Sequence, residues 1–114
     1  MNWIKNLRAW KNISRLDPKR AGNLWNYGLA LIHTEKYQSA VEVLSKGVEL
    51  SPRYGEIYTL RAIAYEELGA FHKALADLKK AQPLLLSKIN QSAIMSRIAN
   101  IRANIKKREQ AALH

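Results

Sequence analysis

The side chains that most often carry out chemistry in proteins are few and scattered in this sequence. Of the histidines, His33 and His72 fall in expected turns and His114 is the last residue, while cysteine is absent. No two histidines have the i, i+4 spacing with which a helix holds a metal ion, so we expect no metal site. The adjacent Glu66 and Glu67 point in different directions on a helix and would make a poor acid–base pair.

The glycines are isolated from one another, so the sequence has no glycine-rich loop that could cradle a phosphate. Together with the scattered histidines and carboxylates, this predicts a protein that is not an enzyme and that uses no cofactor.

Chain length and charge limit which functions remain possible. The 114 residues suffice for one domain, so residues 1–114 are expected to fold as a unit. The formal net charge is +10, and the excess of basic residues lies in residues 1–20 and 89–114. The absence of cysteine suits a reducing compartment, and no apolar run approaches the roughly 20 residues that span a bilayer. No secretory signal is recognisable, and we expect the protein to be cytoplasmic.

Residues 24–52 carry a pattern that the following segment repeats at a shift of 34 residues. The matching positions are Gly28 with Ala62, Tyr37 with Phe71, Ala40 with Ala74, and Leu44 with Leu78. Small residues let the two helices of a hairpin approach closely, and the larger ones fill the space around the contact. Pro52 closes the second helix because proline lacks an amide donor. Pro18 lies 34 residues before Pro52, so residues 1–17 look like the second helix of a repeat without its first.

This pattern and its period resemble the tetratricopeptide repeat over most of residues 4–86. The predicted repeats cover residues 21–54 and 55–87, with helices at 21–34, 38–50, 55–68 and 72–82. Gly69 is expected to end a helix in the left-handed conformation. The second repeat departs from the first at Arg61, where the first has Tyr27. The resemblance implies an all-α fold, a right-handed stack of helical hairpins (an α-solenoid) with an extra helix at each end.

The extra helix in residues 2–15 has an apolar stripe that we expect to dock on the first repeat. The stripe consists of Trp3, Ile4, Leu7, Trp10 and Ser14. A helix that lies on a membrane surface is the alternative, because tryptophan and lysine on opposite faces suit an interface.

The second extra helix is expected at residues 88–111. Its apolar stripe is formed by Ile94, Ile98, Ile101 and Ile105, which lie within about 60° on a helical wheel. An open stack needs a cap at its end, and this helix would supply one. Under a second hypothesis, the four isoleucines are an assembly face that joins two copies of the chain or docks on a larger assembly.

The resemblance also implies a concave surface that the first helix of each repeat lines and that receives a partner's peptide or helix. The candidate residues are those that the hairpins leave unused. They are Trp25, Leu29, Ile32 and His33 in the first repeat, Glu56, Thr59, Ile63, Glu66 and Glu67 in the second, and Arg53 and Tyr54 at the edge between them. This predicts a protein–protein adaptor. The sequence leaves open whether the terminal helix folds back over these residues.

Two other kinds of partner follow from the basic ends and from the resemblance. Basic residues at the two ends, Lys5, Arg8, Lys11, Lys106, Lys107 and Arg108, could attract nucleic acid or an acidic membrane, although a solvated basic face accounts for them equally well. Some members of the tetratricopeptide repeat family bind a chaperone's C-terminal carboxylate through basic side chains. Glu56 and Leu60 stand where those groups would be needed, so we do not expect such a clamp.

Overall fold

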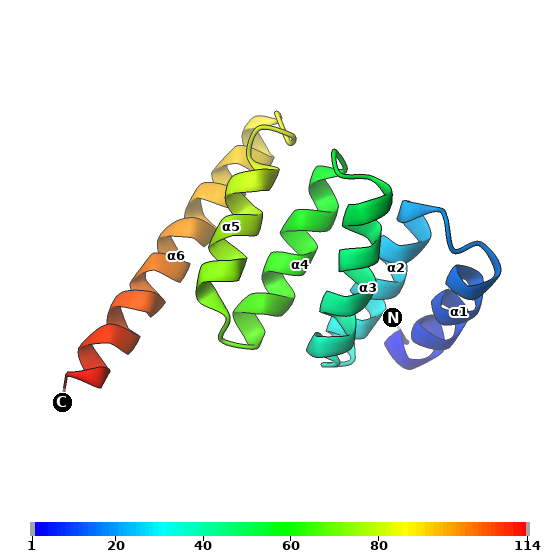
Figure 1. Ribbon diagram of the computed structural model, residues 1–114, viewed down its shortest axis with the longest axis horizontal. Coiled ribbons are helices and arrows are strands. Elements are labelled where there is room, and N and C mark those ends of the chain that lie inside the picture. The colour runs from blue at the N-terminus through cyan, green and yellow to red at the C-terminus, as the bar shows by residue number, and fades with distance from the viewer. Residues whose placement is uncertain (1, 114) are drawn as a thin grey trace.

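The protein is all-α, as predicted. The computed structural model describes residues 2–113, and Met1 and His114 lie outside this range. The described residues form helices and no strand. The helices are α1 (Trp3–Leu16), α2 (Ala21–His33), α3 (Tyr37–Leu50), α4 (Gly55–Glu67), α5 (Phe71–Ala81) and α6 (Lys88–Ala112), shown in Figure 1. Each observed boundary lies within one residue of the predicted one.

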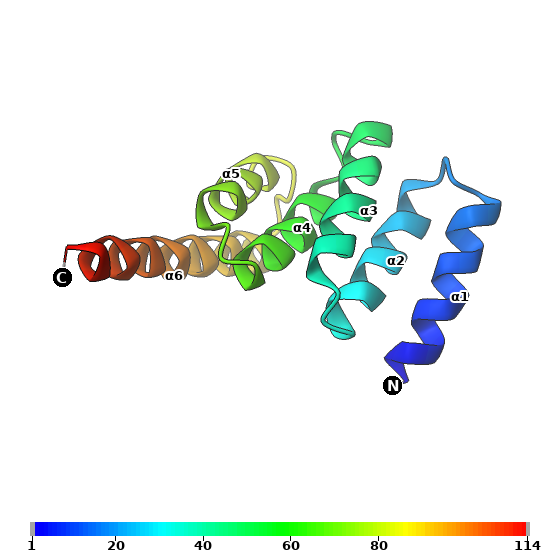
Figure 2. The same ribbon diagram turned by 60° about the horizontal axis from the view of Figure 1, so that its bottom comes forward.

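The helices stack side by side in chain order. α2 packs against α3 and α4 against α5 as two hairpins, α1 adds to α2, and α6 adds to α5. α2 also contacts α4, and an ion pair joins α4 to α6, so these three helices form one side of the stack. Figure 2 shows α5 above α4 and α6, so α5 belongs to the opposite side of the stack. The result is an elongated molecule of 49 × 31 × 26 Å.

The predicted close approach within each hairpin is confirmed. A Cβ atom added to Gly28 would lie 2.5 Å from Cδ2 of Leu44, which is too close for any side chain. At the matching places, Ala40, Ala62 and Ala74 are fully buried. The small residues of the repeat therefore mark the points where helices touch.

The two hairpin turns share one backbone geometry. Gly69 has a φ of +73°, which confirms the predicted left-handed residue, and Glu35 at the matching place has a φ of +61°. In each turn the next amide donates back across the helix end, Lys36 to Leu31 O and Ala70 to Tyr65 O, both at 2.8 Å. This pattern satisfies the last carbonyls of α2 and α4. The sequence pattern does not predict a glutamate in this conformation, which residues other than glycine rarely adopt.

α1 docks on α2 through most of its predicted stripe. Leu7 packs against the core of the first hairpin, and the hydroxyl of buried Ser14 donates to Asn23 O at 3.2 Å. Ile4 was predicted to belong to this stripe, but its side chain is 71% exposed. It lies beyond the edge of the contact with α2, where the exposed basic residues of α1 also lie.

α6 caps the stack with its isoleucines. Ile94, Ile98 and Ile101 are buried in one cluster with residues of α4 and α5, and Ile105 packs against that cluster. This corrects the assembly hypothesis, because the chain's own helices already cover the side chains that would have met a second copy. The far half of α6 is held by Arg108, which donates to Gly69 O at 2.8 Å and lies 4.5 Å above the ring of Phe71.

Candidate partner-binding surface

The predicted residues on α2 form a half-buried apolar row. Trp25, Leu29 and Ile32 recur at intervals of three and four, which places them on one face of the helix. Each packs against the core of the first hairpin and keeps part of its surface exposed. α6 lies at the other end of the stack from α2 in both views and packs on α5 (Figures 1 and 2). The terminal helix therefore does not fold back over this row.

The predicted residues on α4 border a hollow that α6 completes. Thr59 and Ile63 line a cavity of about 230 Å³ together with Glu56, and α6 contributes Asn90, Ala93, Ile94 and Arg97 from the other side. Ile63 also packs against the same core as the α2 row. This side of the stack, which the sequence predicts to be the concave side, thus carries an apolar row on α2 that continues through Ile63 to this hollow.

The two predicted glutamates differ in what they are free to do. Glu66 forms an ion pair with Arg97, and its side chain is largely buried in that contact. Glu67 and Glu56 are exposed. Glu66 thus holds α6 against α4, and the acidic charge that a partner could reach comes from Glu56 and Glu67.

His33 has a packing partner that the sequence did not reveal. Its ring stacks on that of Trp3, with the centroids 3.8 Å apart and the planes 7° from parallel. The pair joins α2 to α1. His33 therefore helps to dock α1 with one face of its ring, while the residue stays exposed.

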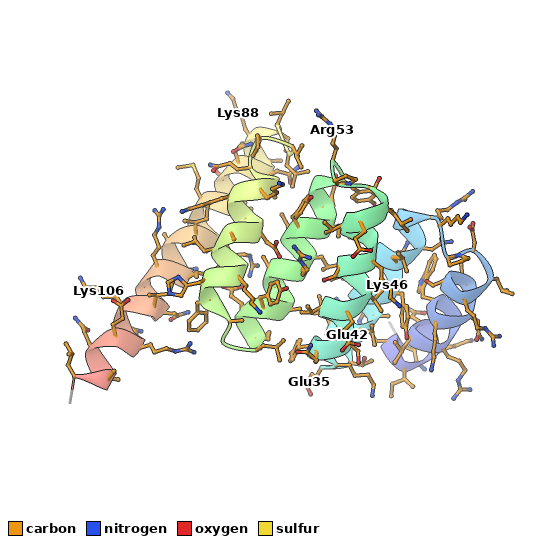
Figure 3. All side chains as sticks on the ribbon, in the orientation of Figure 1. Glu35, Glu42, Lys46, Arg53, Lys88 and Lys106 are labelled. Carbon is orange, nitrogen blue, oxygen red and sulfur yellow. The ribbon has the colours of Figure 1, made fainter. Side chains whose placement is uncertain are left out.

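Arg53 and Tyr54 lie where α3 turns into α4. Arg53 is exposed at the tip of this turn, as Figure 3 shows. Tyr54 is half-buried, and burial, followed by the nearby charge of Glu56, raises the pKa of its hydroxyl above the usual value. A tyrosine hydroxyl can donate a hydrogen bond to a partner.

Sequence reasoning missed the contribution of α6 to the concave side. The predicted binding residues all come from the two repeats and the turn between them, yet Asn90, Ala93 and Arg97 of α6 also line the hollow. Their spacing of three and four is the signal that was available, because it marks a second face of the helix beside the isoleucines.

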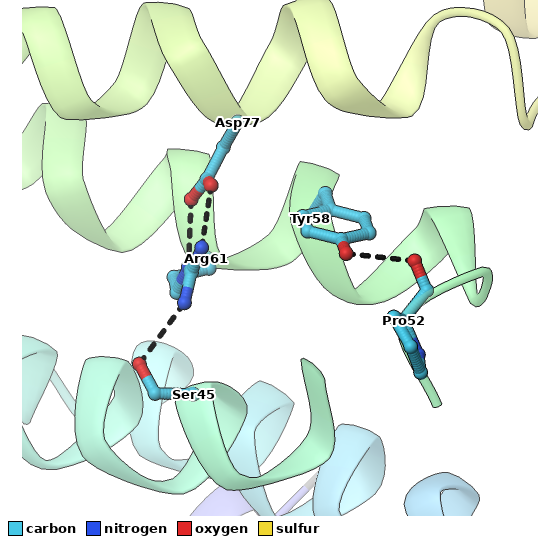
Figure 4. A network of polar contacts seen from close by, with 5 residues as sticks. All are labelled: Ser45, Pro52, Tyr58, Arg61 and Asp77. Carbon is cyan, nitrogen blue, oxygen red and sulfur yellow. Dashed lines mark hydrogen bonds and ion pairs between the residues drawn. The ribbon is translucent and has the colours of Figure 1, made fainter. Parts of the chain in front are cut away.

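The departure of Arg61 from the repeat pattern has a structural cause. The Arg61 guanidinium donates to both carboxylate oxygens of Asp77, from Nε at 2.8 Å and from Nη2 at 2.7 Å, and its Nη1 donates to Ser45 Oγ at 3.1 Å. Figure 4 shows this network between α3, α4 and α5. The hydrogen bond to Asp77 raises the pKa of Arg61 further above its usual value. Arg61 thus connects α3, α4 and α5 inside the stack.

Some of the basic residues at the two ends contact the rest of the stack, and others are exposed. Arg108 is bound to the α4–α5 turn, whereas Lys106 and Lys107 are exposed beside it. Part of the charge that suggested nucleic-acid binding therefore holds α6 in place. Among residues 2–113, no helix is both long and apolar enough to cross a membrane.

The model of the tetratricopeptide repeat family matches residues 21–54 and 55–82, which together exceed half of the chain. A relative in Giardia intestinalis, a UDP-N-acetylglucosamine–peptide N-acetylglucosaminyltransferase, is 33% identical over 67 residues. That match covers 59% of this chain but only 4% of the enzyme, so it says nothing of the enzyme's activity here.

Solved structures share the fold at low sequence identity. The type III secretion translocator chaperone SycD of Yersinia enterocolitica has a TM-score of 0.85 at 16% identity, over 91% of this chain and 74% of its own. The first such repeat domain of Spaghetti (RPAP3), bound to an HSP90 peptide, has a TM-score of 0.83 at 16% identity, over 91% and 80%. PcrH, in complex with the chaperone-binding region of PopD, has a TM-score of 0.82 at 15% identity, over 90% and 80%.

Proposed function

Because this chain belongs to the tetratricopeptide repeat family, we propose that it is a non-enzymatic adaptor that binds a peptide or helix of another protein on its concave side. The binding surface would consist of the α2 row, Ile63 and the hollow between α4 and α6.

The α2 row is the observation that carries this proposal. Trp25, Leu29 and Ile32 are large apolar side chains in one line, half-buried and left uncovered by α6. Apolar side chains grouped in this way on a folded surface mark interaction sites more often than scattered ones do. Tryptophan in particular tends to supply much of an interface's binding energy. Two of the solved neighbours are described as complexes with a partner's peptide or binding region, which agrees with this use of the fold.

The side chains of this surface indicate the partner's chemistry. A partner would place apolar side chains on Trp25, Leu29 and Ile63. Exposed Glu56 and Glu67 would favour basic residues at its edge, whereas Glu66 is already neutralised by Arg97. We therefore propose an apolar segment with flanking lysine or arginine as the ligand of the concave side.

The experiment starts with a pull-down from the source cell lysate after nuclease treatment, which removes partners held only through nucleic acid. The captured protein is then purified and titrated by calorimetry against the wild type, Trp25→Ala and Leu16→Ala. Leu16 is a matched control, because it is a large apolar side chain, 80% exposed, on α1.

We expect Trp25→Ala to weaken binding by about 30-fold, as for a typical interface anchor, and Leu16→Ala to leave it unchanged. Circular dichroism must show equal helical content in all three proteins. Equal affinities for all three would refute the concave surface as the binding site.

A further inference from the structure

The stack contains two equivalent spaces on the side away from the concave surface, one between α1 and α3 and one between α3 and α5. The shift of 34 residues relates them, since it carries α1 onto α3 and α3 onto α5. In the second space, Arg61 extends from α4 and bonds to Asp77 of α5 and Ser45 of α3 (Figure 4). These side chains bridge the three helices and occupy the space between them.

The first space lacks these side chains. The residues that correspond to Arg61, Asp77 and Ser45 are Tyr27, Val43 and Lys11, which cannot make the same network. A hollow of about 400 Å³ remains there. Its lining consists of Lys11, Ser14, Arg15 and Pro18 from α1 and the turn after it, Leu24 and Tyr27 from α2, and Val43 and Lys46 from α3. We call it the α1–α3 hollow.

The α1–α3 hollow has an apolar floor and a basic rim. Leu24 is buried at its floor, and Tyr27 and Val43 are half-buried. Lys11, Arg15 and Lys46 are exposed around it, and no carboxylate lines it. Within residues 2–113, none of these three cations has a carboxylate oxygen within 4.0 Å. These three positive charges are therefore available to pair with negative charges of a ligand.

From this charge and shape we propose that the α1–α3 hollow binds an acidic peptide segment of a partner protein that presents one large apolar side chain. The apolar side chain would enter the hollow and contact Leu24, Tyr27 and Val43. Carboxylates on either side of it would pair with Lys11, Arg15 and Lys46, a complementarity that gives specificity and speeds association.

The size and floor of the hollow favour a peptide over other anions. About 400 Å³ accommodates one aromatic or aliphatic side chain, and a flat bilayer surface would not reach its floor. Phosphates of a nucleic acid would use the basic rim but would leave the apolar floor unfilled. Tyr27 is the single aromatic residue in the lining, so bases have little to stack on.

This surface is separate from the concave one. Tyr27 lines the hollow and Leu29 belongs to the α2 row, and residues two apart lie about 160° from each other around a helix. The proposal therefore stands independently of the adaptor function assigned to the concave side, and the two ligands would differ in charge.

The test is an NMR titration of the ¹⁵N-labelled protein with an acetylated, amidated peptide that has one phenylalanine between two runs of three glutamates. A second peptide with serine in place of phenylalanine tests the role of the apolar floor. We expect the phenylalanine peptide to shift the amides of the hollow's lining, and to bind about tenfold more tightly than the serine peptide.

Two triple variants separate the hollow from the overall charge. Lys11→Gln/Arg15→Gln/Lys46→Gln removes the rim, whereas Lys79→Gln/Arg102→Gln/Lys106→Gln removes the same charge from exposed residues of α5 and α6. We expect the first to weaken peptide binding about tenfold or more, and the second by no more than about twofold. All six side chains are exposed, so both variants should keep the fold.

A third variant fills the hollow with the side chains of the second repeat. Tyr27→Arg/Val43→Asp keeps the net charge and supplies the pair that occupies the equivalent space. We expect the two peptides to bind this protein equally. The rim variant still tests the proposal if this one fails to fold.

Equal binding of the two peptides to the wild type would overturn the proposal, and so would shifts spread over the basic residues of α6. Vesicles of phosphatidylserine and phosphatidylcholine, and a short single-stranded oligothymidylate, are titrated in parallel. Stronger binding of either to the hollow's lining would overturn the peptide as its occupant.

Discussion

Arg61 of α4 and Asp77 of α5 form a two-point ion pair in which both partners are largely removed from water. Their side chains are 17% and 7% exposed, and the two N–O distances are 2.8 and 2.7 Å. In the first repeat Tyr27 and Val43 take these places. One scaffold therefore uses an ion pair in one repeat and two less polar side chains in the other.

This pair should be strongly sensitive to loss of one partner. Asp77→Ala leaves the Arg61 guanidinium buried without its counter-charge, and we expect the free energy of unfolding to fall by about 3–5 kcal/mol. Urea denaturation followed by circular dichroism measures this. The double variant Arg61→Tyr/Asp77→Val, which copies the first repeat, should recover most of the loss. A double variant no more stable than Asp77→Ala would contradict the account.

The left-handed turn at Glu35 offers a stabilising substitution. Glycine adopts this conformation without the steric cost that a side chain brings, although it adds entropy to the unfolded chain. We expect Glu35→Gly to raise the free energy of unfolding by about 0.5–1 kcal/mol in the same urea experiment. Gly69→Ala is the matched opposite, since its new Cβ would also lie 2.8 Å from Nη2 of Arg108, and should destabilise. A destabilised Glu35→Gly protein would show that the glutamate side chain makes a contribution not seen in its contacts.

Arg108 should hold the second half of α6 on the stack. Arg108→Gln removes its hydrogen bond to Gly69 O and its contact with the Phe71 ring, and we expect a loss of about 1 kcal/mol. Amide hydrogen exchange should accelerate in α6 after Ile101 while the hairpins stay protected. Lys107→Gln, which removes an exposed neighbouring charge, should change neither quantity. Equal exchange in wild type and Arg108→Gln would exclude the tether.

The packing of Ile101 predicts a folding role instead of an assembly role. Its side chain is fully buried among α4, α5 and α6, so Ile101→Ala should cost about 2–5 kcal/mol of stability. Light scattering should give the mass of a single chain for the wild type, and the same mass for the variant at a temperature where it is folded. A wild-type dimer that Ile101→Ala dissociates would restore the assembly hypothesis.

The repeat pattern predicted the parts of the fold that depend on local sequence. Gly28 and Ala62 indicated where helices touch, and Gly69 indicated a turn, because each of these needs a particular residue type at one position. The direction in which α6 runs could not be predicted from local sequence. That direction depends on how residues 82–87 turn the chain. The side-chain amide of Gln91 holds this turn, because its Nε2 donates to Gln82 O at 2.6 Å and to Leu85 O. No periodic pattern encodes that contact, so the isoleucines alone favour capping without excluding assembly.

The candidate site was predictable in part for the same reason. Helical spacing selected Trp25, Leu29 and Ile63, whose faces follow from their positions along α2 and α4. It could not show that His33 stacks on Trp3 or that Glu66 pairs with Arg97, because each contact joins side chains from different helices. Charged or aromatic residues at positions that a repeat leaves unused can equally serve a partner or a neighbouring helix.

The order of the helices in the stack also has a kinetic consequence. The helix pairs with substantial contact are neighbours along the chain, apart from α2 with α4. Chains with such short-range contacts fold quickly, and repeat stacks can begin folding at any unit and extend from it. We expect either hairpin to serve as the starting nucleus, with the helices at the two ends joining afterwards. The Arg108–Gly69 contact spans 39 residues, so it should close late in folding and open early when the molecule is pulled from its ends.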